Sequence, residues 1–137
     1  MAKRTKARKR AVELLYEAEA RGVNVGSLLA ERVETPTTQH PLQEYTIAIV
    51  EGLVEHWADV DELLSTYSHG WTLERMPDVD RAVLRVGAWE ILHSEEVPDP
   101  VAISEAVALA TTLSTDESPR FVNGLLARIS EVKPTLV

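Results

Sequence analysis

The chain has 137 residues, 45% of them apolar, which suits one compact domain or two closely packed halves. It has no cysteine and no apolar run near the roughly 20 residues that span a bilayer, which excludes disulfides, thiolate metal sites and a membrane-spanning helix. The net charge is −8, yet six of the fourteen basic residues lie in the first ten positions, so residues 11–137 carry a net charge of −14. This acidic remainder would repel nucleic acid, which excludes a general nucleic-acid coat protein.

Apolar side chains in the first half of the chain recur at the spacing of helices. Between Ala7 and Ala18 they form one stripe, and from Tyr45 to Trp57 they are spaced by four. Prolines and threonines between these stretches are typical of a loop. The pattern predicts, in order, a helix ending near Gly22, a short helix over 27–32, a loop over 34–41, a helix over 45–57 and its continuation to 67 after a break near 58–59.

The second half opens with Gly70 and an apolar connector. Pro77 is expected in the first turn of a helix that reaches about Ile91 and is apolar over a wide arc, so this helix should be central. The pattern then predicts a loop over 94–100, a helix over 101–113, and a last helix with Ser118 as its N-cap, Pro119 as its first residue and Pro134 at its end. No alternating strand pattern or repeat is found, so the predicted fold is all-α with about seven helices.

The basic end places cations on nearly every direction that the apolar stripe of the first helix leaves free. Cations at a helix N-terminus oppose the helix dipole by about 0.3–1 kcal/mol each and repel one another, and a bound phosphate would reverse both penalties. A frayed, solvated terminus explains the same pattern about equally well, whereas a small apolar face without Phe or Trp suits a membrane anchor less. The cations are Lys3, Arg4, Lys6, Arg8, Lys9 and Arg10.

No group of residues has the composition of a catalytic, cofactor or metal site. The four histidines lack the spacing of helical metal ligands, and His56 with Glu55 and Asp59 is interpreted as a surface charge cluster. The serines lack a nucleophile elbow, and the isolated glycines do not form a phosphate-binding loop. We therefore expect neither an enzyme nor a bound cofactor. The tryptophans are expected in the core or between subdomains, at Trp57, Trp71 and Trp89.

The start of the last helix allows a structural and a functional interpretation. Asn123 and Gly124 are poor helix formers in a helix otherwise made of good ones. In the structural interpretation Gly124 allows a close helix approach and Asn123 bonds to a neighbouring backbone. In the functional one Phe121 stacks on a base, while Asn123 and the helix N-terminus contact RNA. Both interpretations stay open at this point.

Several short segments match one known family in their order and spacing. The basic start runs into AVELLY at 11–16, and VDRAVLR at 79–85, WEIL at 89–92, VAISEA at 101–106 and FVNGLL at 121–126 follow. Together these segments resemble the NusB transcription antitermination factors, with most of the signal between about residues 71 and 129. Ser104 stands where the family usually has asparagine, which is a mild departure.

The resemblance implies one all-helical domain of two packed subdomains, about 1–68 and 69–137, without catalytic activity. It implies a cytoplasmic protein that binds the boxA element of ribosomal-operon RNA with NusE, a small-subunit ribosomal protein, in an antitermination complex on RNA polymerase. Glu74 and Asp80 would face NusE. With the residues already singled out, the RNA face would comprise Lys3, Arg4, Lys6, Arg8, Lys9, Arg10, Tyr16, Glu117, Ser118, Arg120, Phe121 and Asn123.

Two alternatives stay open. A helical adaptor that binds only other proteins would explain the same sequence, with an incidental basic tail. Some members of the family also pair as homodimers, which would hide the RNA face, and whether this chain does so stays open.

Overall fold

The computed structural model describes residues 2–37 and 40–136, and this part of the chain contains helices and no strand. The all-α prediction with about seven helices is confirmed. None of the described helices is long and apolar enough to cross a membrane. The elements are α1 (Lys3–Arg21), α2 (Val25–Glu34), α3 (Glu44–Glu55), α4 (Trp57–Tyr67), α5 (Asp78–His93), α6 (Asp99–Leu113), α7 (Ser118–Val132) and a 3-10 helix, η1 (Lys133–Thr135).

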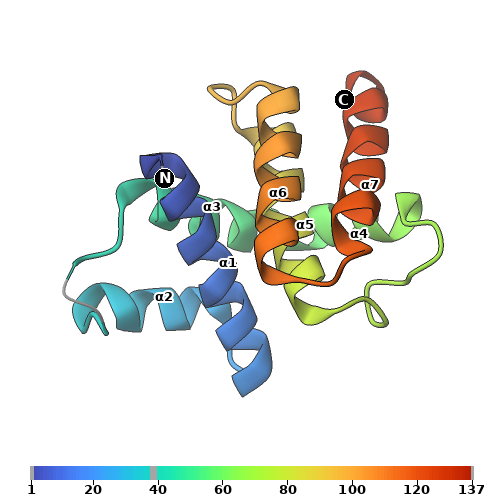
Figure 1. Cartoon of the computed structure of the whole chain (residues 1–137). Coiled ribbons are helices and arrows are strands. Elements are labelled where there is room, and N and C mark those ends of the chain that lie inside the picture. Colours follow the sequence, from blue (N-terminus) through green and yellow to red (C-terminus); the bar gives the residue numbers. More distant parts are fainter. Residues whose placement is uncertain (1, 38–39, 137) are drawn as a thin grey trace.

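Helix α5 lies at the centre of the molecule, as its wide apolar arc predicts. It packs against α1, α3, α4, α6 and α7, and residues 80–84 and 86–91 are buried. Helices α6 and α7 run antiparallel side by side, with α1 and α2 on the other side of the molecule (Figure 1). Since α5 contacts helices from both halves of the chain, the division into subdomains near residue 68 stays a prediction.

Two helix boundaries in the first part of the chain follow from single residues. Gly22 ends α1 in the left-handed conformation (φ 68°), where its N–H bonds to the carbonyls of Ala18 and Glu19, and this end agrees with the prediction. The break predicted near 58–59 instead lies at His56, whose φ of −113° and ψ of 20° leave the helical range. The predicted loop 34–41 begins one residue later, because Glu34 is the last residue of α2; residues 35–37 and 40–41 are loop, and residues 38–39 lie outside the described part.

The prolines lie slightly away from the positions that the sequence pattern predicts. Pro77 precedes α5 as its N-cap residue and does not belong to the first turn. Helix α6 begins at Asp99, within the predicted loop, with Pro100 in its first turn where the missing N–H needs no partner. At the other end of the chain, α7 stops at Val132, and Pro134 lies in η1.

A close contact between α3 and α5 depends on a glycine. A Cβ atom built on Gly52 would lie 2.2 Å from Nε1 of Trp89, so the indole packs directly on the α3 backbone. Trp89 is 8% exposed and belongs to the core, as predicted. The guanidinium carbon of Arg85 lies 4.3 Å from the ring centre of Trp57, and Arg85 also forms an ion pair with Asp61. Both contacts join α4 to α5.

Candidate nucleic-acid interface

Three lysines form an exposed row along α1. Lys3 and Lys6 are exposed and Lys9 is half-buried, and each is one turn from the next along the helix. None of the three has an ion pair among the described residues. The helix begins after Ala2 without a side-chain cap and without an acidic residue in its first turn, so nothing from its own sequence offsets the cations there. We call Lys3, Lys6 and Lys9 the lysine row.

Arg8 is not part of an exposed basic face, which corrects the expectation that its guanidinium is open to RNA. The residue is 3% exposed, and its Nε donates to both carboxylate oxygens of Glu90, at 2.8 and 2.9 Å. Its Nη1 also lies 3.2 Å from Glu105 of α6. Tyr45 of α3 donates a further hydrogen bond to Glu90. Arg8 therefore joins α1 to α5 and α6 inside the protein.

The ionisation of this cluster follows from its burial. Burial raises the pKa of Tyr45 to about 12, and its hydrogen bond to Glu90 adds to the effect. Burial alone would lower the pKa of Arg8, but the bond to Glu90 and the nearby negative charge outweigh it, so the net shift is upward. Tyr45 thus stays a neutral donor and Arg8 a cation at any physiological pH. Tyr45, Glu90 and Glu105 were not among the site residues predicted from the sequence.

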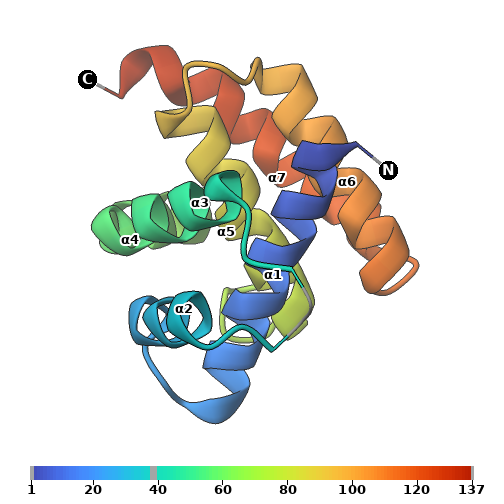
Figure 2. The ribbon, with the colours of Figure 1, turned by 90° about the vertical axis from the view of Figure 1, so that its left-hand side faces the viewer.

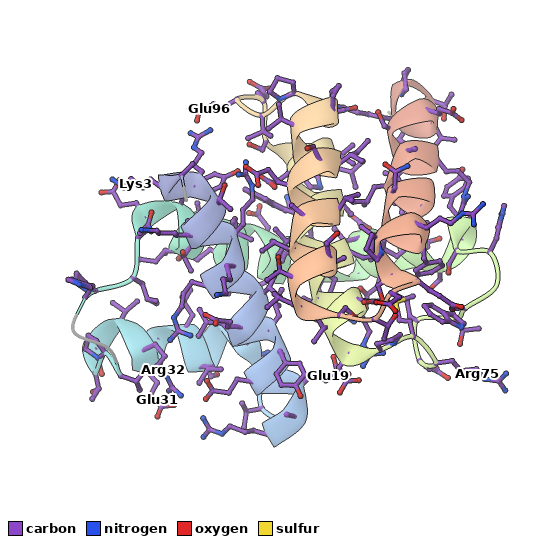
Figure 3. All side chains as sticks on the ribbon, in the orientation of Figure 1. Lys3, Glu19, Glu31, Arg32, Arg75 and Glu96 are labelled. Atoms are coloured by element: carbon purple, nitrogen blue, oxygen red, sulfur yellow. The ribbon has the colours of Figure 1, made fainter. Side chains whose placement is uncertain are left out.

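The two remaining arginines of the basic stretch have acidic neighbours at the surface. Arg4 donates to Glu96 at 2.6 Å, and its guanidinium also lies 4.7 Å from the ring centre of Tyr45. Figure 3 shows Glu96, on the α5–α6 connection, above the end of α1 that carries Lys3. Arg10 lies 3.7 Å from Glu13, one turn further along α1. Both pairs are partly exposed, and such pairs contribute little to stability.

The aromatic side chains expected to meet RNA differ in their surroundings. Tyr16 is 44% exposed, on α1 beyond the lysine row. Phe121 is half-buried and packs edge-on against Trp71, with ring centres 5.0 Å apart and an angle of 65°. Asn123 is exposed, and a Cβ on Gly124 would meet only the end of Arg128, at 3.5 Å. The close helix approach considered for Gly124 is therefore wrong.

Ser118 and Asp80 are both fully buried and bound to each other, which corrects two predicted positions. The Ser118 hydroxyl donates to Asp80 at 2.7 Å, and Ser114 donates to the other carboxylate oxygen at 2.5 Å. Ser118 is the first residue of α7 and not its N-cap, because its side chain points to α5. Asp80, 0% exposed, does not present its carboxylate to a partner. Its role in this structure is to fasten the α6–α7 connection to α5.

The other predicted contacts remain at the surface. Glu117 and Arg120 are exposed at the start of α7, and Glu74 is exposed in the α4–α5 connection. The N-terminus and the α6–α7 connection lie on the same side of the molecule (Figure 2). The start of α1 and the start of α7, which carry most of the predicted RNA face, thus lie on one side of the protein.

His56, interpreted from the sequence as part of a surface charge cluster, lies beside the end of α5. Among the described residues, no three histidine or acidic side chains gather as metal ligands. Instead its ring stacks on His93 at the end of α5, with ring centres 3.7 Å apart and planes 11° from parallel. Burial, and then the electrostatic interaction with His56, lower the pKa of His93, whereas Asp59 and Glu55 act in the opposite direction.

We expect the stability of the protein to fall as the pH drops through the histidine range. Because the pKa of His93 is lower in the folded than in the unfolded chain, the stabilisation from neutral His93 is complete above about pH 6.5 and is lost below it. Thermal melts between about pH 5.5 and 7.5 measure the slope, in a window above the ordinary carboxylate pKa values. His93→Gln should show a shallower slope, and equal slopes would contradict this assignment.

Comparison with known proteins identifies the family. The sequence model of the NusB family matches residues 5–131. This chain belongs to the NusB family. It is 56% identical to the transcription antitermination protein NusB of Beutenbergia cavernae, in a match that covers 99% of this chain and 94% of that protein. The resemblance found in the sequence is confirmed, and as a NusB protein the chain is not an enzyme.

Solved NusB structures share its fold. NusB of T. maritima superposes with a TM-score of 0.81 at 30% identity, covering 95% of this chain and 92% of that one. A chain from a crystal structure of antitermination factors NusB and NusE in complex with dsRNA superposes with a TM-score of 0.80 at 27% identity, covering 94% and 96%. These neighbours agree with the predicted NusB-like arrangement of helices.

Proposed function

We propose that this NusB protein binds boxA-type RNA of ribosomal operons together with NusE, as part of an antitermination complex on RNA polymerase in the cytoplasm. The observation that carries the proposal is the lysine row: Lys3, Lys6 and the partly exposed Lys9 form no ion pair with any described residue, on a chain whose net charge is −8. A local group of free cations on an acidic protein favours a polyanion at that place alone. The related complex of NusB, NusE and dsRNA supports both partners.

The proposed RNA surface combines a cationic part on α1 with a polar and aromatic part at the start of α7. The lysine row, with Arg4 and Arg10 after exchange of their carboxylate partners, would bind phosphates. Tyr16, and the accessible part of Phe121, would stack on unpaired bases. Arg8 and Ser118 would act from behind this surface, by holding α1 and α7 in place. The exposed polar residues Glu117, Arg120 and Asn123 complete it.

The NusE surface would include Glu74 but not the carboxylate of Asp80. Glu74 is exposed in the α4–α5 connection, where it can meet a cationic residue of a partner. Asp80 would support this region only indirectly, through its bonds to Ser114 and Ser118.

A triple substitution of the lysine row by alanine tests the RNA proposal. Because this variant lacks three cations that would bind phosphates, its affinity for a single-stranded boxA RNA should fall about fiftyfold at roughly 0.15 M salt, and the slope of log K against log salt should flatten by about 2. Fluorescence anisotropy at several salt concentrations, with and without NusE, measures both quantities. Light scattering of the free protein reports whether a homodimer hides this surface.

Arg75→Ala serves as the matched control, because Arg75 is exposed and Figure 3 shows it pointing into solvent far from Lys3. This variant should bind RNA within about twofold of the wild type. If the triple lysine variant binds boxA RNA like the wild type, the surface is wrong. If the wild type itself binds NusE but no RNA, the chain is the protein-binding adaptor of the alternative interpretation.

A further inference from the structure

Exposed apolar side chains gather around α2, away from the proposed RNA surface. Six large hydrophobic residues of the described chain are exposed, and three of them lie on α2 or beside it. Val33 near the end of α2 is 50% exposed, Val54 of α3 is 44% exposed, and Val23 just before α2 is 41% exposed. None contributes to the core, so burial within this chain does not explain their apolar character.

A groove of about 630 Å³ runs between α2 and α3 and holds two of these valines. Leu29 and Val33 line it from α2, and Ile47 and Val54 line it from α3. These helices have 10 and 12 residues, so the groove is about 15–18 Å long, which is the length of about three turns of a helix. An amphipathic helix laid into such a groove would bury an apolar stripe against four aliphatic side chains.

The rim of the groove is acidic, and no lysine or arginine is among the described residues that line it. Glu34, Glu51 and Glu55 line it, and among the described residues none of them forms an ion pair. Arg32, the cation of α2, is held by Glu17 and Glu31 and does not line the groove. Figure 3 shows Glu31 and Arg32 together at one end of the molecule.

The charge pattern excludes three occupants, the burial of α1 excludes a fourth, and one remains. The carboxylates repel nucleic acid and anionic lipid. A second copy of this chain, meeting the groove through a two-fold axis, would bring the same glutamates against each other. The chain's own basic helix α1 does not fit, because its apolar face is already buried at residues such as Ala11 and Leu14. The remaining partner is an apolar helix with cationic flanks.

We propose that the α2–α3 groove is a docking site for a cationic amphipathic helix of another protein. Leucine-like side chains at three- and four-residue spacing would enter between Val33 and Val54, and lysine or arginine on either side would pair with Glu34, Glu51 and Glu55. None of the groove residues belongs to α1, α6 or α7. The docked helix and RNA can therefore occupy the protein at the same time.

A designed peptide serves as the probe. It has about 14 residues, with leucine at helical spacing on one face, lysine on both flanks and alanine on the back. We expect it to bind the full chain with a Kd in the micromolar range, and to shift backbone NMR signals of α2 and α3. The same peptide with glutamate in place of lysine should not bind. Absence of binding by the lysine peptide would overturn the proposal.

Surface variants separate this groove from general attraction to an acidic protein. Val33→Ser and Glu51→Lys should each weaken peptide binding about tenfold. The matched controls are Val101→Ser on α6, where the valine is 43% exposed, and Glu131→Lys on α7, and each should change the Kd by less than about twofold.

Two further kinds of result would overturn the proposal. One is an equal loss of binding in the controls or NMR shifts outside α2 and α3. The other is a wild-type dimer that light scattering shows to dissociate on Val33→Ser, which would assign the groove to a second copy of the chain.

Discussion

Replacing Arg8 by alanine should lower the free energy of unfolding by about 3–5 kcal/mol, because it leaves a buried carboxylate without its cation. Glu90 is 1% exposed and receives two hydrogen bonds from Arg8. Tyr45 donates a third, but a neutral hydroxyl does not balance the charge. The helix that carries the lysine row would lose its main polar attachment to α5. Urea unfolding followed by circular dichroism measures the loss.

Two variants show whether the loss of stability in Arg8→Ala comes from the missing charge or from the missing side-chain volume. Lys6→Ala removes an exposed cation from the same helix and should change stability by less than about 0.5 kcal/mol. The combined change Arg8→Met, Glu90→Leu and Tyr45→Phe replaces the whole buried polar group and should recover most of the stability. An Arg8→Ala protein that is as stable as the wild type but deficient in RNA binding would instead assign Arg8 to phosphate contact.

Asp80→Ala should destabilise the protein by about 3 kcal/mol. Asp80 is fully buried and its carboxylate accepts from the hydroxyls of Ser114 and Ser118, and hydrogen bonds to a charged group contribute about 1.5–3 kcal/mol each. Ser118 also contacts Thr115, which limits the loss because the hydroxyls can pair with one another. The same unfolding measurement applies. Hydrogen exchange should show faster opening of the α6–α7 connection.

Asp116→Ala is the control for Asp80→Ala, because Asp116 lies in the same connection but is exposed. It should leave stability within about 0.5 kcal/mol of the wild type. Glu74→Ala tests the other residue expected to face NusE: it should weaken NusE binding without changing stability. If Asp80→Ala weakens NusE binding at unchanged stability, its carboxylate reaches the partner and the buried role is contradicted.

The misplacement of Arg8 has a simple origin in the helical wheel. The apolar stripe drawn through Ala7, Ala11, Leu14, Leu15 and Ala18 puts Arg8 at its edge. Val12, one turn after Arg8, is 2% exposed and extends the buried arc past it. Glu90 offered a second signal, since it is the one charged residue between 86 and 92 of a helix expected to be central, and a buried carboxylate needs a cation. Which cation that is depends on the crossing of α1 and α5, which no local pattern contains.

The serine at the start of α7 is a second residue whose contact depends on the fold and not on the local sequence pattern. Ser-Pro at a helix start predicts a cap, because a serine hydroxyl commonly satisfies the first free N–H groups. Here the hydroxyl bonds to Asp80, 38 residues earlier in the chain, and the helix begins one residue sooner than expected. A charged acceptor brought close by the fold is a stronger partner than a backbone N–H.

The basic end, the seven helices and the family can all be read from the residue order, because helical periodicity, local charge and short motifs are properties of neighbouring residues. Which cations face solvent is different, since it depends on contacts between helices far apart in the chain. Lys3, Lys6 and Lys9 are exposed or partly exposed, whereas Arg8 forms an ion pair with Glu90 and Arg4 forms one with Glu96. An arginine and a lysine on adjacent positions of one helix thus differ in role because only one of them meets a buried carboxylate.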